Sequence, residues 1–218
     1  MKARLLVVSV LVALVVALAT PSFAQVVASD AYQVNYYIQA PCVTPQPLGS
    51  PLSALFTINT GQVGSPIDAP TAHGTVCADI YVFDTNQEML ECCSCPVTAN
   101  GLLAMAVCPN LTGNALTGVS PAIGVIKVVA DQPTGGLCDA RSINSPVNGG
   151  LRSWRTTITG ASRLSLVGLS ENHFQSAPLT AQEQQFLGQA CAFVTYLGSG
   201  RGTCRCTAER EAADLVAD

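Results

Sequence analysis

The sequence predicts a mainly β protein: an antiparallel β-sandwich of about eight strands, stapled by disulfides, with one amphipathic helix near the C-terminus. Three observations lead to this fold class. Apolar and polar residues alternate in short runs that Gly, Pro and Asn clusters separate. A single later segment has helical spacing instead. Ten cysteines, an even number, all follow an apparent export signal.

Residues 1–24 have the plan of a secretory signal peptide. Lys2 and Arg4 provide the positive start, Leu5 to Ala19 is an uncharged apolar run, and small residues precede a cleavage site after Ala24. At 1.5 Å per residue this run reaches about 22 Å, short of the roughly 30 Å hydrocarbon layer of a bilayer. We therefore expect an exported protein, periplasmic, cell-surface or secreted, with no membrane span after cleavage.

The composition of the chain limits the number of domains and the kinds of partner that we expect. Charged residues make up 11% of the chain and the formal net charge is −4. A mildly acidic chain with so few charges has no electrostatic basis for binding nucleic acid. With 49% hydrophobic residues it is not a disordered protein either. We expect one β-sandwich domain over 25–206 and a frayed acidic tail over 207–218.

The predicted strands are the segments in which apolar and polar residues alternate with a period of two. The expected strands are 32–39, 54–58, 75–83, 88–95, 102–108, 123–129, 154–158 and 164–166. In the first of them Tyr32 and Tyr36 fall on the more apolar face, which predicts that they pack in the core. Tyr37 falls on the opposite face, and we expect it at the surface.

The segment 181–197 is the predicted helix. Thr180 and Glu183 have the spacing of a capping box, in which each side chain bonds the other residue's backbone N–H. Apolar residues then recur every three or four positions, and Gly198 is placed to end the helix. One apolar stripe of this helix should pack on the sandwich.

The cysteines are predicted to form a disulfide framework, since the chain is exported and their number is even. The disulfide candidates are Cys42, Cys77, Cys92, Cys93, Cys95, Cys108, Cys138, Cys191, Cys204 and Cys206. Residues 93 and 95 share a strand face about 7 Å apart, beyond the roughly 3.5–4.5 Å Cβ separation of a disulfide. Each cysteine of the triplet 92, 93 and 95 therefore needs a distant partner.

Two pairings follow from the expected geometry. A hairpin with a three-residue loop sets Phe83 opposite Met89, and the same register sets Cys77 opposite Cys95. We therefore expect a Cys77–Cys95 bond. Cys191 lies on the apolar stripe of the helix, where it should hold the returning tail through Cys204 or Cys206.

The sequence is compatible with three functional hypotheses. The leading hypothesis is a non-enzymatic role in binding or in envelope structure, with an unknown ligand or envelope component as partner, no cofactor and no metal. The first alternative is a thiol redox or metal-binding protein, because Cys92 and Cys95 have C-x-x-C spacing and Cys204 with Cys206 could complete four thiolates. The second is a secreted hydrolase using His73 or His173 beside a serine. The chain has no G-x-S-x-G elbow, and no catalytic residue is assigned.

Several segments together resemble a known group of sequences. They are Val76 to Asp84, Glu91 to Thr98, Leu116 to Ser120, Gly124 to Lys127 and Gly198 to Gly200. The chain resembles a group of short exported Cys-rich bacterial proteins, and the Glu-Cys-Cys-x-Cys-Pro block is the most specific part. The resemblance implies a bacterial, extracytoplasmic setting and carries no known activity, cofactor or site.

Overall fold

The computed structural model describes residues 30–39, 52–59, 74–112, 120–159 and 168–197, together with Cys204 and Cys206. These residues form nine strands and one long helix near the C-terminus, which confirms the predicted fold class. The strands are β1 (Tyr32–Ile38), β2 (Leu52–Asn59), β3 (Val76–Asp84), β4 (Met89–Val97), β5 (Leu102–Ala106), β6 (Ile123–Asp131), β7 (Leu151–Thr159), β8 (Gly168–His173) and β9 (Gln175–Ser176). The helices are α2 (Val107–Asn110) and α3 (Ala181–Leu197).

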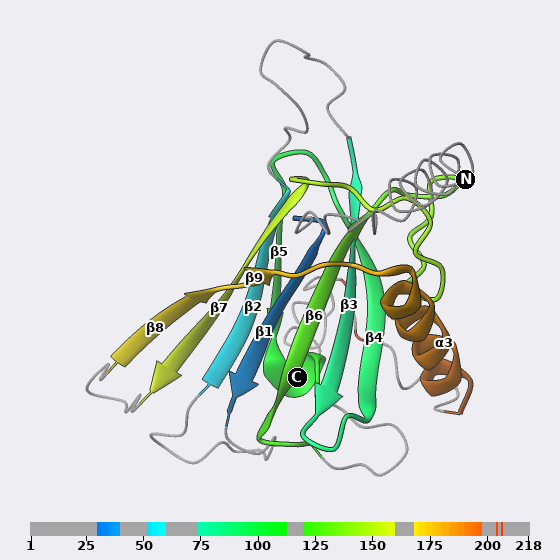
Figure 1. The fold of residues 1–218 in the computed structure, drawn as a ribbon. Helices are drawn as coiled ribbons and strands as arrows, with labels where there is room; N and C mark the ends of the chain where they lie inside the picture. Colours follow the sequence, from blue (N-terminus) through cyan, green and yellow to red (C-terminus); the bar gives the residue numbers. More distant parts are fainter. Residues whose placement is uncertain are drawn as a thin grey trace, which may run out of the picture.

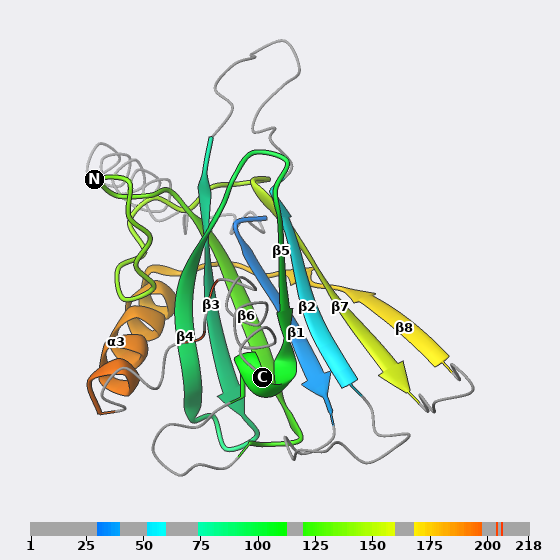
Figure 2. The same cartoon turned by 180° about the vertical axis from the view of Figure 1, so that it is seen from behind.

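The strands form two sheets. Sheet A has the order β4-β3-β6-β1-β9 and sheet B the order β5-β2-β7-β8. Every strand pairing in the described part of the chain is antiparallel. Figures 1 and 2 show the strands fanning apart, with β8 at one side of the molecule and α3 at the other.

Strand β3 lies at the centre of the packing, because both of its faces are covered. Ile80 and Val82 point into the core between the two sheets. Tyr81 and Phe83 point to the opposite face of sheet A, where they pack with residues of α3. Burial on both faces explains why β3 has a nearly continuous apolar sequence rather than strict alternation.

The β3–β4 hairpin contains a bulge that changes its register. Phe83 faces Met89 as predicted, but the next pair is Val82 with Glu91, so Leu90 is an extra residue. Beyond it every pair is shifted by one position, and Cys77 faces Pro96 instead of Cys95. The expected Cys77–Cys95 bond is therefore wrong, because a one-residue shift turns each side chain of a strand to the other face.

The predicted positions of the β1 tyrosines are confirmed for Tyr32 and wrong for Tyr36 and Tyr37. Tyr32 is buried and packs with residues of α3. Tyr37 is fully buried, whereas Tyr36 is 54% exposed. The inner face of β1 also carries Gln33, whose side chain donates to the Leu151 carbonyl (2.8 Å) and accepts from the Ser153 N–H (3.1 Å). These bonds join sheet A to sheet B, so the face of β1 that carries Gln33 and Tyr37 lies toward the core between the sheets, and the prediction that Tyr37 is at the surface is wrong.

Other segments differ from the prediction at their boundaries. β5 ends at Ala106 and continues into α2, instead of reaching residue 108, because Pro109 has no N–H for a strand ladder. The strands β8 and β9 were not expected. β8 is a mostly exposed edge strand with a polar sequence, which gives it no alternating signal. The expected strand 164–166, the signal 1–24 and the tail 207–218 lie outside the described residues.

Candidate functional site

Helix α3 is held on the outer face of sheet A by contacts from its first turn. The Glu183 N–H donates to Thr180 Oγ1 (3.1 Å), as the capping box predicts. The Glu183 carboxylate does not reach back along the helix; it accepts from Lys127 Nζ (2.6 Å) and from the Tyr32 hydroxyl (2.8 Å). Burial raises the pKa of Glu183, but these two hydrogen bonds outweigh it and leave the pKa below its ordinary value.

Two disulfides fix the elements on this face. Cys92 on β4 is bonded to Cys191 on α3, with 5.6 Å between their Cα atoms. Cys77 on β3 is bonded to Cys138, which anchors the loop that follows β6. The Tyr81 hydroxyl also donates to the Ala140 carbonyl (2.8 Å). The helix is therefore tied covalently to β4 and the loop to the neighbouring strand β3.

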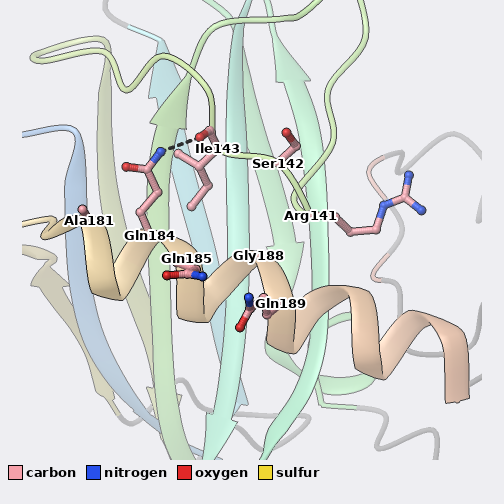
Figure 3. A pocket seen from close by; sticks show the side chains of 8 residues that line it. All are labelled: Arg141, Ser142, Ile143, Ala181, Gln184, Gln185, Gly188 and Gln189. Atoms are coloured by element: carbon pink, nitrogen blue, oxygen red, sulfur yellow. Dashed lines mark hydrogen bonds between the residues drawn. The ribbon is translucent and has the colours of Figure 1, made fainter.

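A groove of about 410 Å³ lies between this loop and α3 (Figure 3). Its lining residues are Arg141, Ser142, Ile143, Ala181, Gln184, Gln185, Gly188 and Gln189. Gln184 donates to the Ile143 carbonyl across the groove, while Gln185 and Gln189 follow along the same helix. Among its polar groups the groove therefore offers three side-chain amides, which both donate and accept hydrogen bonds.

Gly188 sets the distance between the helix and the loop. A Cβ atom at this position would lie 2.7 Å from the Arg141 carbonyl oxygen. No ordinary Cβ approaches an oxygen so closely, so the loop can rest on α3 only because residue 188 is glycine. The contact also marks the boundary between the groove and a second pocket, and Arg141 lines both.

The second pocket, of about 310 Å³, is lined largely by disulfide-bonded cysteines. Its residues are Cys92, Cys93, Ser94, Cys138, Asp139, Ala140, Arg141, Cys191, Thr195, Cys204 and Cys206. Cys93 is bonded to Cys204 and Cys95 to Cys206. The prediction that Cys191 pairs with Cys204 or Cys206 is therefore wrong: Cys92 takes Cys191, because the bulge turns Cys92 toward α3.

The charges beside the groove neutralise each other. Arg141 Nη2 lies 2.8 Å from Asp139 Oδ2, and both side chains are about half exposed. Hydrogen bonds from Arg141 lower the pKa of Asp139, and the same pair raises the pKa of Arg141. Arg141 is the one charged residue of the groove lining, and its charge is balanced by Asp139 just outside the groove, which favours an uncharged ligand over an ionic one.

A buried carboxyl group lies on the same face. Asp79 on β3 is 1% exposed, and its Oδ1 accepts a hydrogen bond from Ser94 Oγ on β4. Burial raises the pKa of Asp79 to about 8, and the nearby charges of Asp131 and Asp139 add to the effect. Its other oxygen, Oδ2, has no hydrogen-bond partner among the residues that the structure describes.

The residues of the alternative hypotheses do not gather as expected. Cys92 and Cys95 lie on opposite faces of β4: Cys92 packs with α3 and Cys95 lies between the sheets. The C-x-x-C pair therefore cannot present its two thiols to one ion. His173 lies on the edge strand β8, and its ring centroid is 5.5 Å from that of Trp154. His73 lies outside the described residues.

All nine described cysteines are disulfide-bonded, which confirms the predicted framework for this part of the chain. Eight of them pair with one another, and Cys108 is bonded as well. Cys42 lies outside the described residues. Sequence reasoning missed the groove entirely. The one sequence feature that points to the groove is the cluster of glutamines in the first half of the helix, which lies outside the apolar stripe.

In the described part of the chain, fold and site together define a disulfide-stapled, two-sheet antiparallel β protein with a glutamine-bearing groove beside its long helix α3. No helix in the described part of the chain is long and apolar enough to cross a membrane. The disulfides are consistent with an extracellular or otherwise oxidising compartment. The chain matches no family model, no curated protein and no solved structure.

Proposed function

We propose that this chain is an exported, non-enzymatic binding protein of the bacterial cell envelope, and that its ligand is a segment of a neutral glycan. The observation that carries the proposal is the groove between α3 and the loop 141–143. Its walls present the amides of Gln184, Gln185 and Gln189 and the hydroxyl of Ser142. Sugar hydroxyls both donate and accept hydrogen bonds, as these side chains do.

The construction of the groove supports a binding role. Two disulfides and the Lys127–Glu183 ion pair fix the helix and the loop before any ligand arrives. A rigid site loses little conformational entropy when it binds, which favours affinity. The charge balance of Arg141 with Asp139 offers no excess charge to an acidic or a basic polymer.

The test is binding of the mature chain to an array of neutral envelope glycans, followed by calorimetry on the best ligand. We expect the variant Q185A/Q189A to bind about 10- to 30-fold more weakly, because two hydrogen bonds of roughly 1 kcal/mol each are lost. The matched control is Q182A, since Gln182 is exposed on the same helix but does not line the groove. Equal affinity of both variants, or no binding to any neutral glycan, would refute the proposal and favour a purely structural role in the envelope.

A further inference from the structure

Four cysteine sulfurs meet at the edge of the sandwich. The disulfides Cys93–Cys204 and Cys95–Cys206 lie side by side, with Cα separations of 5.3 and 5.2 Å. Cys93 Sγ and Cys95 Sγ are 3.7 Å apart, although they are not bonded to each other. The Sγ atoms of Cys93, Cys95 and Cys206 all lie within 4.8 Å of one another. We call these four cysteines the sulfur cluster.

The backbone explains why the sulfurs gather. Cys93 and Cys95 are two positions apart on β4, so their side chains share the inner face of the strand. Their partners, Cys204 and Cys206, have the same spacing and follow in the same order. Each half is therefore a C-x-C pair, and the two pairs face each other.

We propose that the sulfur cluster binds one Zn²⁺ ion when both of its disulfides are reduced. Structural zinc sites use four cysteine thiolates in a tetrahedron with Zn–S bonds of about 2.3 Å, which places the sulfurs about 3.8 Å apart. The Cys93–Cys95 separation already has this value. On reduction the bonded pairs open from disulfide contact to the same distance, and Cys204, whose Sγ is not within 4.8 Å of all three other sulfurs, moves closer to complete the tetrahedron. The site is independent of the glycan groove.

The chemistry balances with a dithiol as the reductant. Each disulfide takes two electrons and two protons from one dithiol, which becomes a disulfide itself, so two dithiols convert the cluster into four thiols. Zinc then replaces four protons, which pass to solvent, and the four thiolates bind the ion. Oxidation by two small-molecule disulfides reverses the sequence: each accepts two electrons and becomes a dithiol or a pair of thiols with protons from solvent, the two protein disulfides form, and the zinc is released.

Reductant and metal have a route to the cluster. Cys93, Cys204 and Cys206 line the 310 Å³ pocket, and Cys206 is half-buried, whereas Cys95 is fully buried behind them. The Cys92–Cys191 bond borders the same pocket from the opposite face of β4. Reduction should therefore begin at Cys206 and proceed inward.

The test uses the mature chain, reduced with dithiothreitol and desalted without oxygen. Titration with Co²⁺ should give the absorption bands of tetrahedral thiolate coordination, saturating at one ion per chain, and one equivalent of Zn²⁺ should displace it. Alkylation of the zinc-loaded chain, read by mass spectrometry, should spare Cys93, Cys95, Cys204 and Cys206 and modify the other six cysteines. The oxidised chain should bind neither metal.

Two double variants test whether the sulfur cluster itself holds the zinc. C93S/C204S removes two ligands and should weaken zinc binding by about 100-fold or more. C77S/C138S removes a disulfide outside the cluster and should keep the stoichiometry and the affinity. Absence of metal binding by the reduced wild type, or protection of a different set of cysteines, would overturn the proposal. The alkylation pattern of the wild type decides the question even where a variant does not fold.

Discussion

Cys92 faces Tyr81 across the β3–β4 hairpin, one position away from the partner that a regular hairpin would give it. The extra residue Leu90 causes this shift, and it decides the connectivity of the whole triplet. Cys92 turns outward to the helix, while Cys93 and Cys95 turn inward to the tail. Without the bulge all three would face the opposite way, because side chains alternate along a strand.

Disulfide mapping of the non-reduced mature protein should recover Cys77–Cys138, Cys92–Cys191, Cys93–Cys204 and Cys95–Cys206. Cys108 is also bonded, and Cys42 is the one cysteine left in the sequence, so we expect these two to be linked. Trypsin separates Cys204 from Cys206 at Arg205, and electron-transfer fragmentation can resolve the triplet. A peptide joining Cys77 to Cys95 would contradict the bulged register.

Removal of the bond between β4 and α3 should destabilise the fold. Cys93 is already bonded to Cys204, so the Cys92–Cys191 bond closes only one more loop, of about 15 residues, between the helix and the tail. A loop of this length corresponds to a gain of about 3 kcal/mol in the free energy of unfolding. We expect the variant C92S/C191S to lose about this much free energy of unfolding in urea under non-reducing conditions. A loss below about 1 kcal/mol, with an unchanged dependence on urea, would mean that the α3 contacts alone hold the helix.

Sequence reasoning recovered the elements whose signal is local. The helix 181–197 has caps and helical spacing, and the strands around residues 32–38 and 76–84 have clear apolar patterns. It failed where a distant partner decides the outcome. Tyr37 is buried because Gln33 on its face bonds the backbone of sheet B, and Cys92 pairs with Cys191 because Leu90 is inserted in the hairpin. The groove was not predictable, since Gly188 and Arg141 meet only in the folded chain.

The buried Asp79 should make stability depend on pH. Burial raises its pKa to about 8, whereas an unfolded aspartate has a pKa of about 4. Between these values the folded chain holds a proton that the unfolded chain has lost. This contribution to stability is therefore full below about pH 4 and is lost as the pH rises toward 8.

Because residue 79 cannot ionise in the variant D79N, its free energy of unfolding should not decrease in this way as the pH rises. Urea midpoints measured across this range should fall for the wild type relative to D79N as the pH rises. The control D139N should keep a constant difference from the wild type across this range, because hydrogen bonds from Arg141 lower the pKa of Asp139, and its contribution is lost only as the pH falls below about 4. A constant difference between the wild type and D79N at every pH would show that Asp79 is ionised in the folded chain.

The contact of Gly188 with the Arg141 carbonyl gives the last prediction, in which two effects oppose each other. Alanine stabilises a helix interior by about 1 kcal/mol relative to glycine. At residue 188, however, the added Cβ would lie 2.7 Å from a backbone oxygen, so the loop must move.

Forced shifts of a packed backbone cost about 1–3 kcal/mol, and we expect G188A to be less stable than the wild type by about 1 kcal/mol. It should also bind the glycan more weakly, because the loop forms one wall of the groove. The matched control is G74A, whose Cβ would meet no atom within 4 Å. An increase in the urea midpoint for G188A, with unchanged glycan affinity, would mean that the loop yields at no cost and does not shape the groove.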